Sequence, residues 1–235
     1  MAEALLETVQ LSRRFGALAA VDGVSIAFQP LGVHAVIGPN GAGKSTFLNL
    51  LSGELRATSG AVRFRGKDVT RSPPNRISRL GIGRTYQTAN VFADLTCAEC
   101  VWLAAHAHGR DGEAAAALGA CGLREQAGKV AGDLSYGEQR QLEIGMILAT
   151  GSELLLLDEP LAGLGHDEAA RIVELLRRLA AVHTLILVEH DMDAVFSIAR
   201  TITVMVDGRV LETGSAEQIR RSAAVREAYL GSETP

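Results

Sequence analysis

The stretch from Val33 to Leu51, VHAVIGPNGAGKSTFLNLL, decides the fold of this chain. Its first five residues form a short apolar run, which is typical of a strand that is buried on both faces. A glycine-rich loop follows, and the residues from Ser45 to Leu51 have the apolar spacing of a helix. A strand that leads through such a loop into a helix predicts an α/β protein with a parallel sheet.

The loop itself matches the pattern G-x-x-x-x-G-K-[ST] at every fixed position. Its glycines let consecutive backbone N–H groups turn inward, and with the helix N-terminus these groups form a cradle for an anion. Lys44 can reach the terminal phosphates of a nucleotide, and the Ser45 hydroxyl can bind Mg²⁺. A glycine-rich turn without a ligand is the alternative, but it leaves the lysine and the serine unexplained. The predicted phosphate-binding residues are Gly38, Pro39, Asn40, Gly41, Ala42, Gly43, Lys44, Ser45 and Thr46.

Further strands and helices alternate along the rest of the chain. Strand-like residues lie between Leu5 and Phe28, and the apolar runs Leu154 to Leu157 and Leu185 to Val188 predict two more buried strands. Asp207-Gly208 predicts a tight hairpin turn. The other expected strands are 61–64, the segment around 69, 201–206 and 209–212; the expected helices are 98–123 with a loop near 109–112, 137–148, 167–181 and 216–230.

The composition excludes some classes of function. The 235 residues carry a formal net charge of -4, which argues against a protein that binds nucleic acid mainly by electrostatic attraction. No stretch approaches the ~20 apolar residues of a membrane span. The segment from Met1 to Gln10 has two glutamates and no basic residues, so we expect no signal peptide. We therefore expect a cytoplasmic protein that reaches a membrane, if at all, by docking on a partner.

The three cysteines give a weak signal. Cys97 and Cys100 form a C-x-x-C pair, and Cys121 stands apart. A zinc site normally needs a second pair of ligands at a suitable spacing, which this chain lacks. A redox pair remains an alternative, but small apolar residues on an alanine-rich helix in a reducing compartment are the preferred interpretation.

A pair of acids follows the apolar run that ends at Leu157. An acid at the end of such a strand helps to hold Mg²⁺ in P-loop enzymes, and we assign that role to Asp158. Glu159 then lies beside the terminal phosphate, where it can polarise an attacking water molecule. Two solvated carboxylates would be the interpretation if the phosphate loop were not present.

Four further motifs follow in the order found in ABC (ATP-binding cassette) ATPases, and the chain resembles that family over nearly its whole length. Residues 134–139, LSYGEQ, are similar to the family's signature sequence. Gln87 resembles the Q-loop glutamine, His190 the switch histidine and Phe15 the adenine-stacking aromatic residue. Each alone fits a structural role as well, because buried aromatics, polar caps and helix N-caps are common. The combination favours the family.

The resemblance implies an ATP hydrolase with an α/β P-loop core, an antiparallel β subdomain and an inserted helical subdomain. Within a single domain, 1–235, the core would comprise 1–88 and 151–235, and the helical signature subdomain 89–150. The implied catalytic residues are Glu159, His190 and Gln87, and the implied Mg²⁺ ligands are Ser45, Gln87 and Asp158. Besides the phosphate loop, the implied ATP-binding residues are Phe15, Ser135, Gly137 and Glu138.

The signature also implies partners. Ser135 and the N–H groups of the following helix can bind a γ-phosphate, which in the family is held by the phosphate loop of another subunit. This implies a head-to-tail dimer, with a copy of this chain or a similar one, around two ATP molecules. The resemblance further implies integral membrane permease subunits, indirectly a solute-binding protein, and a peripheral place at the cytoplasmic face of the inner membrane; no nucleic acid is expected.

A finer resemblance is to importers of branched-chain amino acids, carried by residues 80–87, 134–140, 188–192 and 228–231. Residues 142–146 are closer to the related importers of urea and short-chain amides. Gly165 and His166 depart from the family, which has aspartate or asparagine and then proline in the loop after Glu159, so we expect altered coupling between the two sites. The alternatives are the ATPase subunit of an exporter or lipid-extraction system, a soluble non-transport ABC protein and a non-catalytic regulatory cassette.

Overall fold

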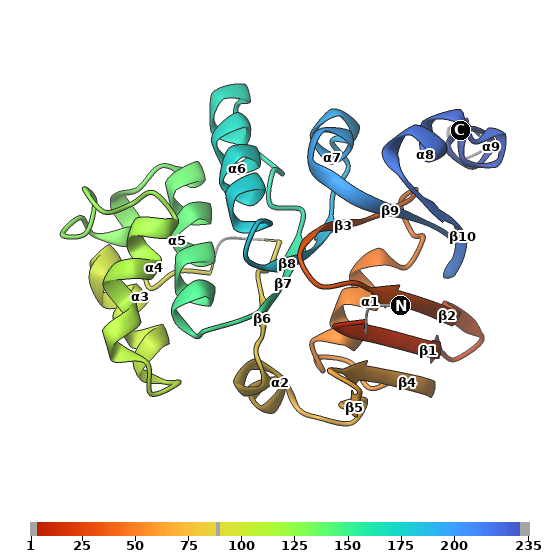
Figure 1. The fold of residues 1–235 in the computed structure, drawn as a ribbon, viewed down its shortest axis with the longest axis horizontal. Helices are drawn as coiled ribbons and strands as arrows, with labels where there is room; N and C mark the ends of the chain where they lie inside the picture. The colour runs from red at the N-terminus through yellow and green to blue at the C-terminus, as the bar shows by residue number, and fades with distance from the viewer. Residues whose placement is uncertain (1–3, 88–89, 231–235) are drawn as a thin grey trace.

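A mainly parallel sheet runs through the centre of the protein (Figure 1). The structure is a computed structural model, and it describes residues 4–87 and 90–230. The strands of this sheet are β3 (Gly32–Ile37), β6 (Ile82–Arg84), β7 (Leu154–Asp158), β8 (Thr184–Val188), β9 (Ala199–Val206) and β10 (Arg209–Gly214). Over the described residues their order is β10-β9-β3-β8-β7-β6. All neighbours pair in parallel except β10, which is antiparallel to β9.

The apolar runs of the sequence form the inner strands of this sheet. Every residue of β7 and β8 is buried, because both strands have neighbours on either side and are covered on both faces. The predicted hairpin joins β9 to β10: Asp207 and Gly208 have φ angles of 48° and 76°, which a two-residue hairpin turn of this kind requires. The predicted parallel sheet is therefore confirmed.

A second, antiparallel sheet lies beside the first. It consists of β1 (Leu6–Phe15), β2 (Leu18–Phe28), β4 (Ser59–Phe64) and β5 (Lys67–Asp68), in the order β2-β1-β4-β5 over the described residues. Helix α1 (Lys44–Leu51) joins the two sheets through one apolar core, to which it contributes Phe47 and Leu48. The glycine-rich loop before α1 is thus fixed between a buried strand and a buried helix.

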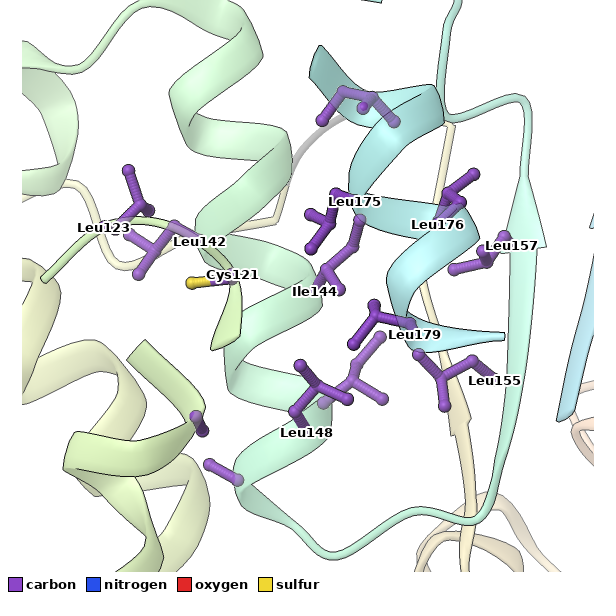
Figure 2. Close-up of a cluster of buried hydrophobic side chains, with 14 of the residues drawn as sticks. Cys121, Leu123, Leu142, Ile144, Leu148, Leu155, Leu157, Leu175, Leu176 and Leu179 are labelled. Atoms are coloured by element: carbon purple, nitrogen blue, oxygen red, sulfur yellow. The ribbon is translucent and has the colours of Figure 1, made fainter. Parts of the chain in front are cut away.

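Helices fill most of the segment from residue 97 to 149, at the left of Figure 1. These are α3 (Cys97–His106), α4 (Ala114–Ala120) and α5 (Tyr136–Ala149), with short 3-10 turns at Asp111–Glu113 and Ala131–Asp133. Figure 2 shows that α5 packs on both sides, with Leu142 toward Leu123 and Ile144 toward Leu175 of α6 (His166–Leu179). Helix α5 therefore connects the helical segment to the sheet. The boundary expected at residues 88 and 89 lies outside the described residues.

Several elements differ from the expectation. Helices α2 (Pro74–Leu80) and α7 (Met192–Ile198) and the short strand β6 are additional. The helix expected over 216–230 is two helices, α8 (Ala216–Arg221) and α9 (Ala223–Leu230). The chain is extended at Ser222, whose hydroxyl accepts the N–H of Val225 and so caps the start of α9. Gly231, which belongs to the C-terminal resemblance, lies outside the described residues.

Two further expectations concern the cysteines and the membrane. Cys97, Cys100 and Cys121 are buried free thiols within the helical core, and burial raises the pKa of each, to about 12 for Cys121. Buried protonated thiols are poor nucleophiles, which agrees with a packing role. In the described part of the chain, none of the helices combines the length and the apolar character that crossing a membrane requires.

Candidate functional site

A pocket of about 530 Å³ lies over the glycine-rich loop. It gathers residues from six separate parts of the chain. The loops at the carboxyl ends of the parallel strands meet at one edge of the sheet, and the turn between β1 and β2 lies beside them. Its described lining is Phe15, Leu18, Ala19, Ala20, Asn40, Gly41, Ala42, Gly43, Lys44, Ser45, Thr46, Gln87, Glu159, His190 and Asp207. The structure thus brings Phe15, Gln87, Glu159 and His190 together with the predicted phosphate loop.

The backbone of the loop has room only for glycine at two positions. Gly43, with φ of 94°, precedes α1 directly, and a Cβ there would lie 2.1 Å from the carbonyl oxygen of Ala20. A Cβ at Gly38 would lie 2.1 Å from the carbonyl oxygen of Met205. The loop therefore packs against β2 and β9 as closely as backbone atoms allow, and its turn places backbone N–H groups at the helix N-terminus.

Lys44 is buried at the start of α1 and bends back over its own loop. Its Nζ donates to the carbonyl oxygens of Gly38, at 2.7 Å, and Pro39, at 3.0 Å. Burial lowers the pKa of Lys44, while the acids at Glu159 and Asp158 oppose that shift. An ammonium group has three donors, so one beyond these two contacts is available for a phosphate oxygen.

Asp158 ends β7 and is 3% exposed. Its Oδ2 pairs with Nη2 of Arg84 at 3.4 Å, while its Oδ1 is buried without a hydrogen-bond partner among the described residues. Burial raises the pKa of Asp158, and the Arg84 guanidinium opposes the rise. A buried carboxylate oxygen without a partner is unfavourable unless a ligand binds it, and carboxylate and hydroxyl oxygens suit Mg²⁺. The residues present therefore fit that ion, with Ser45 in the pocket.

The described residues contain no cluster of three or more acidic, histidine or cysteine side chains that would hold a metal by themselves.

Glu159 and His190 form a direct contact at the pocket. Glu159 Oε1 lies 2.7 Å from His190 Nε2, and the two side chains are 19% and 45% exposed. Glu159 has a φ of 48°, a left-handed conformation that is costly for a residue with a side chain and is often found at functional sites. The buried carboxylate of Glu189 accepts the N–H groups of Leu161, at 2.7 Å, and His190, at 2.9 Å. Glu189 thereby joins the loops that follow β7 and β8.

Phe15 and Gln87 complete the pocket. Phe15, at the end of β1, is 45% exposed, so part of its ring is available for stacking. The guanidinium of Arg13 lies 4.5 Å from the centre of its ring. Gln87 follows β6 and is exposed in the pocket.

The signature residues lie elsewhere on the surface and do not line this pocket. Ser135 is the N-cap of α5. Its hydroxyl accepts the N–H of Glu138, and the Glu138 carboxylate accepts the N–H of Ser135, which forms a capping box as expected for a helix start. The Ser135 hydroxyl donates to Glu168 Oε1 at 2.9 Å, and this bond lowers the pKa of Glu168. Gly137 N–H points to the same oxygen, at 3.4 Å. The signature therefore binds an anionic group, here a carboxylate of the same chain.

Comparison with known proteins agrees with this geometry. The family profile described as ABC transporter matches residues 21–162, which is more than half of the chain. The chain belongs to the ABC transporter ATP-binding cassettes. A second profile, described as branched-chain amino acid ATP-binding cassette transporter, matches residues 209–234 at the end of this cassette.

Relatives resemble the cassette over its full length. It is 38% identical to the high-affinity branched-chain amino acid transport ATP-binding protein BraF of Pseudomonas aeruginosa, over 98% of this chain and 99% of that protein. It is 37% identical to LivG of Escherichia coli over the same shares. A solved cassette in its ADP conformation, MJ1267, has a TM-score of 0.89 and 30% identity, over 97% of this chain and 98% of that one. A nucleotide-free cassette has a TM-score of 0.87 and 29% identity, over 96% and 98%.

The cassette fold and nucleotide binding are thus established for this chain. Sequence reasoning had not identified four charged residues that hold the site in place: Arg84, Arg140, Glu168 and Glu189. Each belongs to or lies near a recognised motif, but a contact between residues far apart in the chain has no sequence signature of its own.

Proposed function

We propose that this cassette is the ATP-hydrolysing subunit of an importer for branched-chain amino acids or a related small solute such as urea or an amide. The observation that carries the proposal is full-length similarity to BraF and LivG, combined with a pocket that unites the phosphate loop, Glu159 and His190. Integral permease subunits would hold the cassette at the cytoplasmic face of the inner membrane, and a solute-binding protein would act indirectly. The expected partners include no nucleic acid.

ATP would bind with its adenine on Phe15 and its phosphates over the loop from Gly38 to Thr46. The N–H groups of that loop and the Lys44 ammonium group neutralise the phosphate charge. Asp158, Ser45 and Gln87 are the residues that would hold Mg²⁺, which when bound supplies positive charge against the developing negative charge of phosphoryl transfer.

Hydrolysis would use Glu159 as the base. Its carboxylate accepts a proton from a water molecule whose oxygen attacks the γ-phosphorus, while the bond from that phosphorus to the ADP oxygen breaks. His190, 2.7 Å from the Glu159 carboxylate, would orient it and contact the γ-phosphate. The strained backbone at residue 159 fixes the direction of the side chain.

A second cassette would complete each site. Ser135 and Gly137 hold an anionic group away from the pocket of their own chain, which supports a head-to-tail arrangement in which they bind the partner's γ-phosphate. The γ-phosphate then provides the differential affinity that closes the dimer, and hydrolysis reopens it.

A purification from native membranes tests the proposal. A tagged chain is extracted with a mild detergent, and the proteins that accompany it are identified by mass spectrometry, with Lys44→Ala as a variant that keeps the same outer surface. The expected result is two multi-span membrane proteins with both forms, and a second cassette if the dimer is heteromeric. Recovery of ribosomes or DNA without any membrane protein would refute the importer.

A further inference from the structure

Two buried arginines hold the loop that carries Gln87. Arg84, at the end of β6, donates to the hydroxyl of Ser52 at 2.6 Å and pairs with Asp158 at 3.4 Å. These contacts tie the start of the loop to the end of α1 and to the end of β7. Arg140 of α5 reaches the same loop from the helical segment.

Arg140 is 1% exposed, although arginine side chains are rarely buried so completely. Its Nη1 donates to the carbonyl oxygen of Tyr86, and its Nη2 donates to the carbonyl oxygen of Gln87. Nη1 also pairs with Glu143 Oε2 at 3.1 Å, one turn further along α5. Because a buried guanidinium needs partners for its donors, it binds firmly to the backbone of the Gln87 loop.

Glu143 completes this contact. Its Oε1 accepts the N–H of Tyr86 at 3.1 Å, so Arg140 and Glu143 together bind both backbone polar groups of Tyr86. Burial raises the pKa of Glu143, and the hydrogen bond from Tyr86 and the charge of Arg140 oppose the rise. The pair and the loop are thus joined by three hydrogen bonds, although Arg140 Nε has no partner among the described residues.

Helix α5 links this contact to the signature residue Ser135. Ser135 caps the helix, and Arg140 follows one to two turns later on the same 14-residue helix. Helix α5 buries apolar side chains on both sides, so it is packed as one continuous element between Ser135 and Ala149 (Figure 2). A displacement of Ser135 is therefore transmitted to the backbone carbonyl groups that Arg140 holds.

We propose that Arg140, paired with Glu143, is a positioning residue that sets the place of Gln87 from the signature helix. The proposal rests on the proposed function, in which Ser135 and Gln87 of one chain serve two different nucleotides. When Ser135 binds the γ-phosphate of the nucleotide in the partner's pocket, the position of Gln87 in the chain's own pocket then changes. Arg140 touches neither nucleotide.

The variant Arg140→Lys tests this role. Lysine keeps the positive charge beside Glu143, but its donors all sit on a single nitrogen. It therefore lacks the planar fork with which Nη1 and Nη2 of Arg140 each reach a different carbonyl oxygen. A matched control is Arg177→Lys on α6. Arg177 also pairs with a glutamate three residues away, Glu174, but its side chain is 52% exposed and has no part in the proposed contact.

Four quantities are measured on the full-length chains: the thermal midpoint, the dissociation constant for ATP, the turnover number, and the Mg²⁺ concentration at half-maximal turnover. We expect Arg140→Lys to have a lower thermal midpoint, because buried contacts are lost, but to stay folded at the assay temperature and to keep the ATP affinity. Its turnover falls about tenfold to a hundredfold, because misplacing a reacting group by ~1 Å has effects of this size. Its Mg²⁺ requirement rises because Gln87 is displaced, and Arg177→Lys behaves as the wild type.

Two results would overturn the role of Arg140. One is wild-type turnover and Mg²⁺ requirement in Arg140→Lys. The other is a turnover that falls only in step with the thermal midpoint and the ATP affinity, which indicates a purely structural residue. If the wild-type chain itself releases no phosphate from MgATP, the proposed function fails with it, and that result is distinct from an active wild type with an equally active variant.

Discussion

Replacing Glu159 by glutamine removes a base while leaving the site almost unchanged in shape. The two side chains have the same size, and the glutamine oxygen can keep the 2.7 Å contact with His190. The carboxylate also opposes the lowering of the Lys44 pKa, so its loss makes the ammonium group easier to deprotonate. The phosphate loop is otherwise untouched, and we expect Glu159→Gln to bind ATP and to favour the closed dimer.

The expected loss of turnover follows from the role of the carboxylate. A positioned general base contributes about 10²–10⁴-fold to a rate, which corresponds to about 2.7–5.5 kcal/mol of barrier. Phosphate release from MgATP is measured under saturating ATP, and retained ATP is counted after rapid removal of free nucleotide. Wild-type turnover in Glu159→Gln would refute Glu159 as the base, and loss of ATP binding would refute the interpretation that its side chain acts only in the chemical step.

Three further variants test the rest of the site. Saturation with ATP-Mg at ~100 times its Kd should stabilise the wild type by about 2.7 kcal/mol, or about 5–11 °C for a chain of this size; differential scanning calorimetry should show almost no such shift for Lys44→Ala. Asp158→Asn should abolish Mg²⁺-dependent hydrolysis. Because burial raises the pKa of Asp158 in the folded state, the protonated form is favoured there, and stability is lost as the pH rises through that pKa. The nucleotide-free Asp158→Asn chain should therefore unfold at a higher temperature than the wild type at neutral pH, an advantage that disappears in acid; a lower midpoint at neutral pH would contradict it. Gly43→Ala forces a Cβ to within 2.1 Å of a backbone carbonyl of Ala20, and urea unfolding should show a loss of about 1–3 kcal/mol; unchanged stability would show that the loop can move away.

The sequence predicts the main elements because their signals are local. The run before Gly38 and the run from Leu154 are too apolar to lie on a surface, and both are inner strands. Asp207-Gly208 is a turn by its own backbone preference, and the structure has it as such. In each case the residues alone carry the information.

The elements that sequence reasoning missed depend on tertiary contacts. Strand β6 has three residues, one of them Gly83, and becomes a strand because it pairs with β7. Ser222 divides the expected C-terminal helix because its hydroxyl caps α9. The local sequence does not show whether a serine at this position caps a new helix or continues the old one. Short elements of this kind are decided by packing more than by propensity.

For the site, the sequence predicts which residues meet but not what holds them. The motif residues of the pocket lie together, whereas the signature lies apart from them and binds Glu168. That contact joins residues 33 positions apart. The roles assigned to the individual site residues stay predictions until the variants above are measured.

The loop after Glu159 shows what the departure at Gly165 changes. Gly165 is the N-cap of α6 and has no side chain that could accept an N–H of the first turn, while Glu168 accepts the Gly165 N–H at 3.4 Å. His166 is almost fully exposed beside Asp167. Altered coupling across the proposed dimer stays a prediction.

Transport by a reconstituted complex tests the central claim most directly. The cassette is purified with its membrane partners, placed in vesicles with the solute-binding protein and ATP on opposite sides, and the uptake of labelled leucine is followed. We predict that leucine uptake requires ATP and disappears when Glu159→Gln replaces the wild-type chain. The importer function would be contradicted by a wild-type complex that hydrolyses ATP but accumulates none of these solutes: leucine, isoleucine, valine, urea or a short-chain amide.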